Sequence, residues 1–173
     1  MRIFLITFLI LITPVLSFAD LRIDITKGNT EPIPIAFLDL NSRSKNEKNI
    51  SISIGEVVKN NLSRSGLFSI LPKRVFFEKS INFNDRPEFE NWKITNAQGL
   101  FHGRIRIVNK KLNIEFRLWD IFSQKQMVAQ QLSTEVTNWR RIAHVISDII
   151  YQRITGESGY FDSRLVYISE SGK

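Results

Sequence analysis

His102 and His144 are the two histidines of the chain, and there is no cysteine. Imidazole can act as a general base or a metal ligand, but a zinc site needs three or four ligands close together. The two histidines fall on different predicted elements, so we interpret them as a strand residue and an exposed helix residue. Without cysteine the sequence holds no thiolate that could act as a nucleophile or a metal ligand.

Other catalytic patterns are also missing from the sequence. Gly99 and Gly103 flank a predicted strand and do not open a helix, so they match a phosphate-binding loop poorly. The acidic residues are scattered and form no evident catalytic pair. The sequence therefore predicts a protein that is not an enzyme, with no catalytic residues, no cofactor and no metal site.

The formal net charge of +7 at pH 7 raises the question of an anionic partner. RNA-binding motifs gather basic and aromatic residues on one surface. Here the basic residues are spread, and the adjacent pairs are Lys73-Arg74, Lys110-Lys111 and Arg140-Arg141. We predict no nucleic-acid partner and interpret the charge as solvated surface that assists association with acidic partners.

Residues 1–19 have the three-part layout of a secretory signal peptide. A positive start is followed by an apolar run over residues 3–12, a break at Pro14 and a predicted cleavage between Ala19 and Asp20. The alternative, a retained membrane anchor, needs roughly 20 consecutive apolar residues, and this run is shorter. We therefore expect export to the periplasm and no membrane span after cleavage.

Hydrophobic spacing along the rest of the chain predicts a two-layer α+β fold, with a mixed sheet of about five strands and two main helices packed on it. Strand patterns cover residues 21–25, 32–38, 67–71, 101–107, 112–118 and 126–135. Helical spacing covers residues 50–62, 87–92 and 138–154, with left-handed stops at Gly66 and Gly156. The last three strands are expected to form a meander.

Three further expectations concern a strand, a loop and a helix face. Pro32 and Pro34 donate no backbone hydrogen bond, so the beginning of their strand is expected at a sheet edge. Residues 41–49 are polar and are expected to form a loop. The last helix is expected to turn an outer face to solvent that carries Arg140, Arg141, His144 and Asp148.

The segment Leu21–Ile25 alternates apolar with charged side chains close to the predicted mature start. It is either an integral strand of the domain's own sheet or a segment that pairs with the exposed sheet edge of a partner. Exchange between these arrangements would make the segment a signal that can be shown or hidden.

Several separated motifs, in the right order along the chain, resemble those of the TolB family. They are Leu21–Gly28, Pro32–Ala36, Leu62–Phe68, Leu118–Asp120, Arg140–His144 and Ile154–Arg164. The resemblance implies the periplasmic component of the Tol–Pal system, which links inner and outer membranes and supports outer-membrane constriction during cell division. It also implies an N-terminal α/β domain, here residues 20–157, that precedes a β-propeller.

The same resemblance implies partners. The extreme mature N-terminus would bind the C-terminal domain of TolA, and the propeller would bind the lipoprotein Pal. The residues implied in the TolA contact are Asp20, Leu21, Arg22, Ile23, Asp24, Ile25, Thr26 and Lys27.

Residues 158–173 would then be a linker and the first strand of a truncated propeller. A single strand cannot bury its apolar face, so this segment is expected to be poorly ordered or loosely attached. We expect the chain to be a fragment rather than a natural stand-alone domain. The alternative function is a different secreted envelope adaptor, which would bind other envelope components and ignore TolA.

Overall fold

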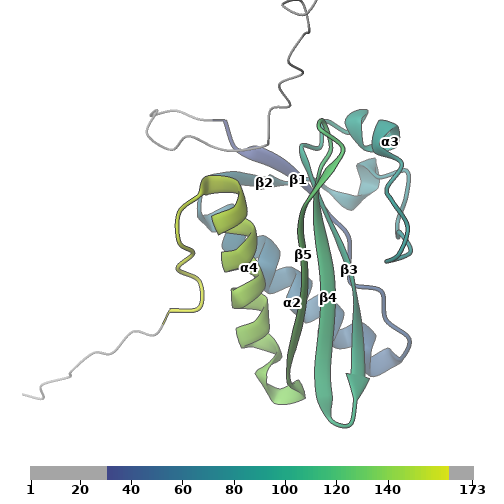
Figure 1. Ribbon diagram of the computed structural model, residues 1–173, viewed down its shortest axis with the longest axis vertical. Helices are drawn as coiled ribbons and strands as arrows, with labels where there is room; N and C mark the ends of the chain where they lie inside the picture. Colours follow the sequence, from purple (N-terminus) through teal and green to yellow (C-terminus); the bar gives the residue numbers. More distant parts are fainter. Residues whose placement is uncertain (1–30, 164–173) are drawn as a thin grey trace, which may run out of the picture.

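Five strands form one mixed sheet in the order β2-β1-β3-β4-β5, in a computed structural model that describes residues 31–163 (Figure 1). The strands are β1 Ile33–Phe37, β2 Phe68–Ile70, β3 Gly99–Val108, β4 Lys111–Asp120 and β5 Lys125–Glu135. The helices are α2 Lys45–Arg64, α3 Phe89–Lys93 and α4 Trp139–Thr155, with 3₁₀ turns at Lys73–Val75 and Val136–Asn138. The predicted α+β class and mixed five-stranded sheet are confirmed. The expected strand at 21–25 and the expected propeller strand lie outside the described residues.

β1 lies between β2 and β3 and runs parallel to both, so it is not an edge strand. Its first two residues nevertheless pair with β2 alone, because the register with β3 begins at Ile35 and Gly99. The carbonyl of Pro34 points towards the β3 side, where it accepts the N–H of Gln98 at 2.9 Å. The ring nitrogen of Pro34 points the same way, ahead of the start of β3, so its missing donor breaks no ladder bond.

α2 begins at Lys45, and the expected loop over residues 41–49 is therefore wrong from that residue onward. Ser44 is the N-cap: its hydroxyl accepts the N–H of Glu47, and the Glu47 carboxylate accepts the N–H of Ser44, both at 3.2 Å. This capping box satisfies N–H groups that the first turn leaves free. Glu47 also accepts the N–H of Ile107 at 2.9 Å, which ties the start of α2 to β3.

The predicted meander of β3, β4 and β5 is confirmed, with both pairs antiparallel. Asn109 and Lys110 make the first turn with φ values of 51° and 62°, the positive values that a tight hairpin turn needs. Gly103 allows β4 to approach closely, since a Cβ there would lie 2.5 Å from the carbonyl oxygen of Glu115.

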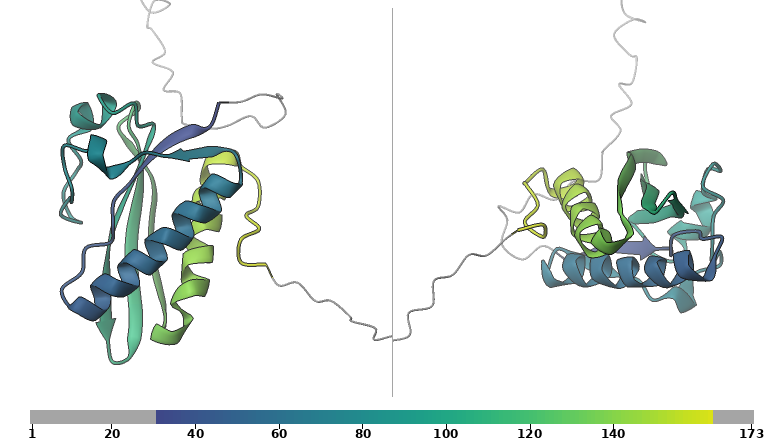
Figure 2. Two further views of the ribbon diagram at one scale, coloured as in Figure 1. Left: turned by 180° about the vertical axis from the view of Figure 1, so that it is seen from behind. Right: turned by 90° about the horizontal axis from the view of Figure 1, so that it is seen from below.

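Both long helices cover the same face of the sheet and pack against each other (Figure 2, left). Between them and the strands lies the main core, built from alternate residues of β1, β3 and β4 and the apolar stripes of the helices. The rings of Phe37 and Phe101 stack at a centroid distance of 4.2 Å in this core. The helices end as predicted, with Gly66 at φ 74° and Gly156 at φ 81°.

The opposite face of the sheet is covered at one end only, by residues 72–98 with α3 (Figure 1). A second, smaller core lies there, and its members are Ala36, Leu38, Phe76, Ile81, Phe89, Trp92, Ala97, Leu100, Trp119 and Ile121.

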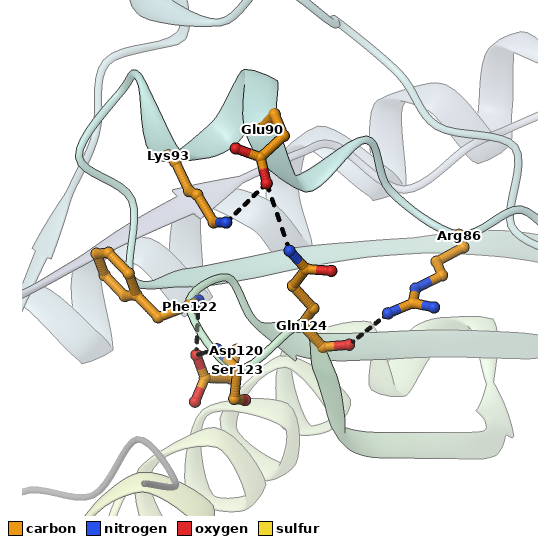
Figure 3. A network of polar contacts seen from close by, with 7 residues as sticks. All are labelled: Arg86, Glu90, Lys93, Asp120, Phe122, Ser123 and Gln124. Carbon is orange, nitrogen blue, oxygen red and sulfur yellow. Dashed lines mark hydrogen bonds and ion pairs between the residues drawn. The ribbon is translucent and has the colours of Figure 1, made fainter. Parts of the chain in front are cut away.

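A polar network joins this layer to the turn between β4 and β5 (Figure 3). Arg86 donates to the carbonyl of Gln124 at 2.9 Å, and Glu90 accepts from Lys93 at 2.7 Å and from the Gln124 amide at 3.4 Å. Asp120 shapes the turn, since its carboxylate accepts the N–H groups of the two residues that follow Ile121, at 2.9 and 3.1 Å. The network therefore fastens α3 to the turn between β4 and β5.

Candidate partner-binding site where the chain enters and leaves the domain

The predicted partner-binding residues 20–27 and the predicted cleavage between Ala19 and Asp20 lie outside the described residues. The structure does describe the place where the chain enters the domain, because residues 31 and 32 lead directly into β1. It also describes residues 156–163, with which the chain leaves α4.

A series of contacts places these two parts of the chain at the same end of the domain. Ile33, the first residue of β1, pairs with Phe68 of β2. The Phe68 ring lies edge-on to Tyr151 of α4, with centroids 6.2 Å apart. Tyr151 in turn contacts the rings of Tyr160 and Phe161, at 5.5 and 5.8 Å. One aromatic cluster therefore connects the beginning of β1 with the segment that follows α4.

Asp148 of α4 holds the departing segment by its backbone. One carboxylate oxygen accepts the N–H of Phe161 at 2.8 Å and the other accepts the N–H of Asp162 at 3.0 Å. Gly159 packs directly on the helix, since a Cβ there would lie 2.5 Å from the Cα of Asp148. Arg141 adds an ion pair to Asp162 at 3.2 Å. The expectation that the segment after residue 157 is loosely attached is therefore wrong for residues 159–162.

Tyr151 is the centre of the cluster and is buried, with 8% of its surface exposed. Burial raises the pKa of its hydroxyl, and the neighbouring Tyr160 and Glu157 raise it further. The phenol therefore stays neutral through the physiological range, and the cluster acts by packing.

The outer face expected for α4 is only partly correct. Arg140 and Arg141 are exposed as predicted, whereas His144 and Asp148 are half-buried. The side-chain amide of Asn61 in α2 lies 2.9 Å from Nδ1 of His144 and 3.0 Å from the hydroxyl of Ser147. His144 thus belongs to the contact between the two helices, and Asp148 belongs to the clamp on the departing segment.

His102 is a buried strand residue, 1% exposed, under the second layer. Its Nε2 accepts the indole N–H of Trp119 at 2.9 Å. Burial lowers the pKa of His102 to about 4, and the charge of Arg117 lowers it further in the same direction. The imidazole is therefore neutral at pH 7 and occupied by a structural hydrogen bond. The two histidines are not brought together, and residues 31–163 hold no group of three metal-ligating side chains.

No helix within the described part of the chain is long and apolar enough to cross a membrane.

Comparison with known proteins agrees with the motif resemblance. A family model described as the TolB amino-terminal domain matches residues 21–127. The Tol-Pal system protein TolB of Pelagibacter ubique (strain HTCC1062) is 42% identical and aligns with 95% of this chain and 39% of its own length. The chain thus spans less than half the length of that relative.

The crystal structure of TolB from Acinetobacter baumannii has a similar fold, with a TM-score of 0.64 over 77% of this chain and 31% of that one, at 21% identity. The family match covers more than half of the chain and most of the sheet. The chain belongs to the TolB family and carries its amino-terminal domain.

Proposed function

We propose that this chain is a periplasmic protein-binding component of the Tol–Pal envelope system and not an enzyme. The observation that carries the proposal is the 42% identity to a Tol-Pal system TolB over 95% of the chain, together with the match of its amino-terminal domain to the family. Residues 1–19 would direct export and be removed between Ala19 and Asp20.

The partner site would be the mature N-terminus, residues 20–27, and its partner the C-terminal domain of TolA. The alternating side chains of Leu21–Ile25 suit an added strand, which gains affinity from main-chain hydrogen bonds. Downstream of this segment the chain enters β1, which pairs with β2, and β2 is the last strand on its side of the sheet. The same segment could therefore dock on its own domain or on the partner.

The contacts that hold residues 159–162 on α4 support a coupling between the places where the chain enters and leaves the domain. Asp148, Gly159 and the Tyr151 cluster fix the direction in which the chain leaves, next to the place where residues 31–33 enter β1. By resemblance, a propeller that follows would bind Pal. A change at that side would then bias the N-terminal segment between its docked and free arrangements.

The test is a calorimetric binding titration of the exported chain, from Asp20 to Lys173, against the TolA C-terminal domain. A matched protein that lacks residues 21–28 serves as the comparison. Binding that disappears with the deletion supports the proposal. Equal binding by both proteins would place the contact elsewhere, and no binding by either would favour a different envelope adaptor.

A further inference from the structure

The sheet face opposite the two long helices has an uncovered part. Residues 72–98 cover that face near the beginning of β3, while β3, β4 and β5 continue beyond α3 towards the Asn109–Lys110 turn (Figure 1). Within residues 31–163, no helix packs on this continuation.

Strand register determines which side chains share the uncovered face. Arg104 pairs with Glu115, which pairs with Gln131 of β5; Arg106 pairs with Asn113, and His102 with Arg117. Directly opposed residues point to the same face, and the intervening residues Ile105, Ile114 and Phe116 lie in the main core. At the margin of residues 72–98 and beyond it, this face is therefore polar and rich in arginine. We call Arg104, Arg106, Glu115 and Arg117 the arginine face.

Positive charge exceeds negative charge on this face. Arg104 donates to both carboxylate oxygens of Glu115, each at 2.8 Å. The carboxylate of the arginine face is therefore already paired. Within residues 31–163, no carboxylate forms an ion pair with Arg106 or Arg117. Burial lowers the pKa of Arg106, and the neighbouring charges of Arg43 and Arg104 lower it further, although Glu47 and Glu115 oppose this. An additional carboxylate would relieve that crowding.

The guanidinium groups are also held in place before any partner arrives. Arg104 and Arg117, both partly buried, lie over the ring of Phe83 at the edge of the covering residues 72–98, at 4.6 and 4.7 Å from its centroid. Arg106 donates to the carbonyl of Asn41 at 2.8 Å. Fixed guanidinium groups lose little conformational entropy on binding and match carboxylates with two parallel hydrogen bonds.

We propose that the arginine face binds an acidic segment of a partner protein, with carboxylates on Arg106 and Arg117. Glu115 favours a polypeptide over an anionic membrane, since a membrane would place uniform negative charge against it, whereas a polypeptide can place a donor there. The neighbouring neutral side chains, Asn113 and Gln131, offer further hydrogen bonds to such a segment. This surface is separate from the N-terminal segment proposed to contact TolA.

The test measures fluorescence anisotropy of a labelled peptide of alternating Glu and Ser at low ionic strength. Replacement of both arginines (Arg106→Gln with Arg117→Gln) is expected to weaken binding at least about tenfold, because two charge-assisted contacts are lost. The matched control, Arg64→Gln with Arg140→Gln, removes the same charge from exposed helix positions and is expected to weaken it less than about threefold. Circular dichroism melting identifies any variant that fails to fold.

A charge reversal keeps the test decisive if the neutral variant folds poorly. Arg106→Glu with Arg117→Glu is expected to lose the Glu-Ser peptide and to bind a Lys-Ser peptide. Deletion of residues 21–28 is expected to leave Glu-Ser peptide binding unchanged, which separates this surface from the proposed TolA contact. Equal weakening in the test and control pairs, or no peptide binding by the parent, would overturn the proposal. The proposal would also be overturned if phosphatidylglycerol vesicles bound through Arg106 and Arg117 and the peptide did not displace them.

Discussion

The two faces of the sheet are stabilised in different ways. The face under α2 and α4 is covered along the sheet by apolar side chains, with stacked rings at Phe37, Phe101 and Phe116. The other face combines a small core at one end with buried polar groups such as His102 and with the arginine face beyond it. The first face is insensitive to ionisation and depends on shape, whereas the second depends on hydrogen bonds and charge. The first is therefore suited to holding the fold and the second to contacting partners.

The strongest test of this contrast is Phe101→Ala. Phe101 is fully buried and lies between the rings of Phe37 and Phe116, at 4.2 and 5.5 Å. Truncation leaves a cavity, and we expect a loss of about 3–5 kcal/mol in the free energy of unfolding, measured by urea denaturation. Phe101→Leu, the milder control, should lose clearly less. A loss below about 1 kcal/mol for the alanine variant would show that this core does not dominate stability.

The second face is expected to respond to pH through His102. Its pKa falls from the ordinary 6.5 to about 4 in the folded protein, so the unfolded chain binds a proton in this interval that the folded chain does not. Stability attributable to His102 is thus full above pH 6.5 and declines as pH falls towards about 4, with a loss of about 3 kcal/mol. Urea denaturation at several pH values measures the slope.

His102→Gln is the matched comparison for the pH effect, since a glutamine amide oxygen can still accept the indole N–H of Trp119. This variant should lose the part of the pH dependence of stability that His102 contributes, while the part contributed by the carboxylates stays. Identical pH profiles for parent and variant would contradict the assigned role.

The capping box on the helical side should have an intermediate effect. Ser44→Ala removes the acceptor for the N–H of Glu47, and we expect a loss of about 1 kcal/mol, measured by thermal or urea unfolding. Ser44→Asp keeps an acceptor and should restore most of it. If alanine and aspartate behaved alike, the hydrogen bond would not contribute to stability.

The smallest effect is expected on the arginine face. Glu115→Gln breaks the pair with Arg104, whose side chains are 25% and 32% exposed, so the loss should stay below about 1 kcal/mol. The same variant should bind the acidic peptide more tightly, because the competing carboxylate is removed. Large destabilisation with unchanged peptide binding would mean that the pair is structural rather than part of a binding surface.

Local patterns were enough to predict much of the fold. The alternation of β3 and β4, the apolar stripe of α4 and the left-handed ends at Gly66 and Gly156 were all found from neighbouring residues. The start of α2 was missed, although Ser44 and Glu47 carried a capping signal. The contact between Asp148 in α4 and Gly159 after the helix could not be predicted, because no short-range sequence pattern links the two positions.

Local sequence patterns specify which residues alternate and where the helices stop, because these depend on periods of two and 3.6 residues and on local backbone freedom. The family came from the resemblance of separated motifs. Only the tertiary structure shows that His102 is buried while Arg104 is partly exposed, although both lie in β3 and on the same face of the sheet. It also decided that β1 is interior and that His144 meets Asn61. The physical reason is that burial depends on which distant segment packs over a face, and that choice is made by contacts far apart in the chain.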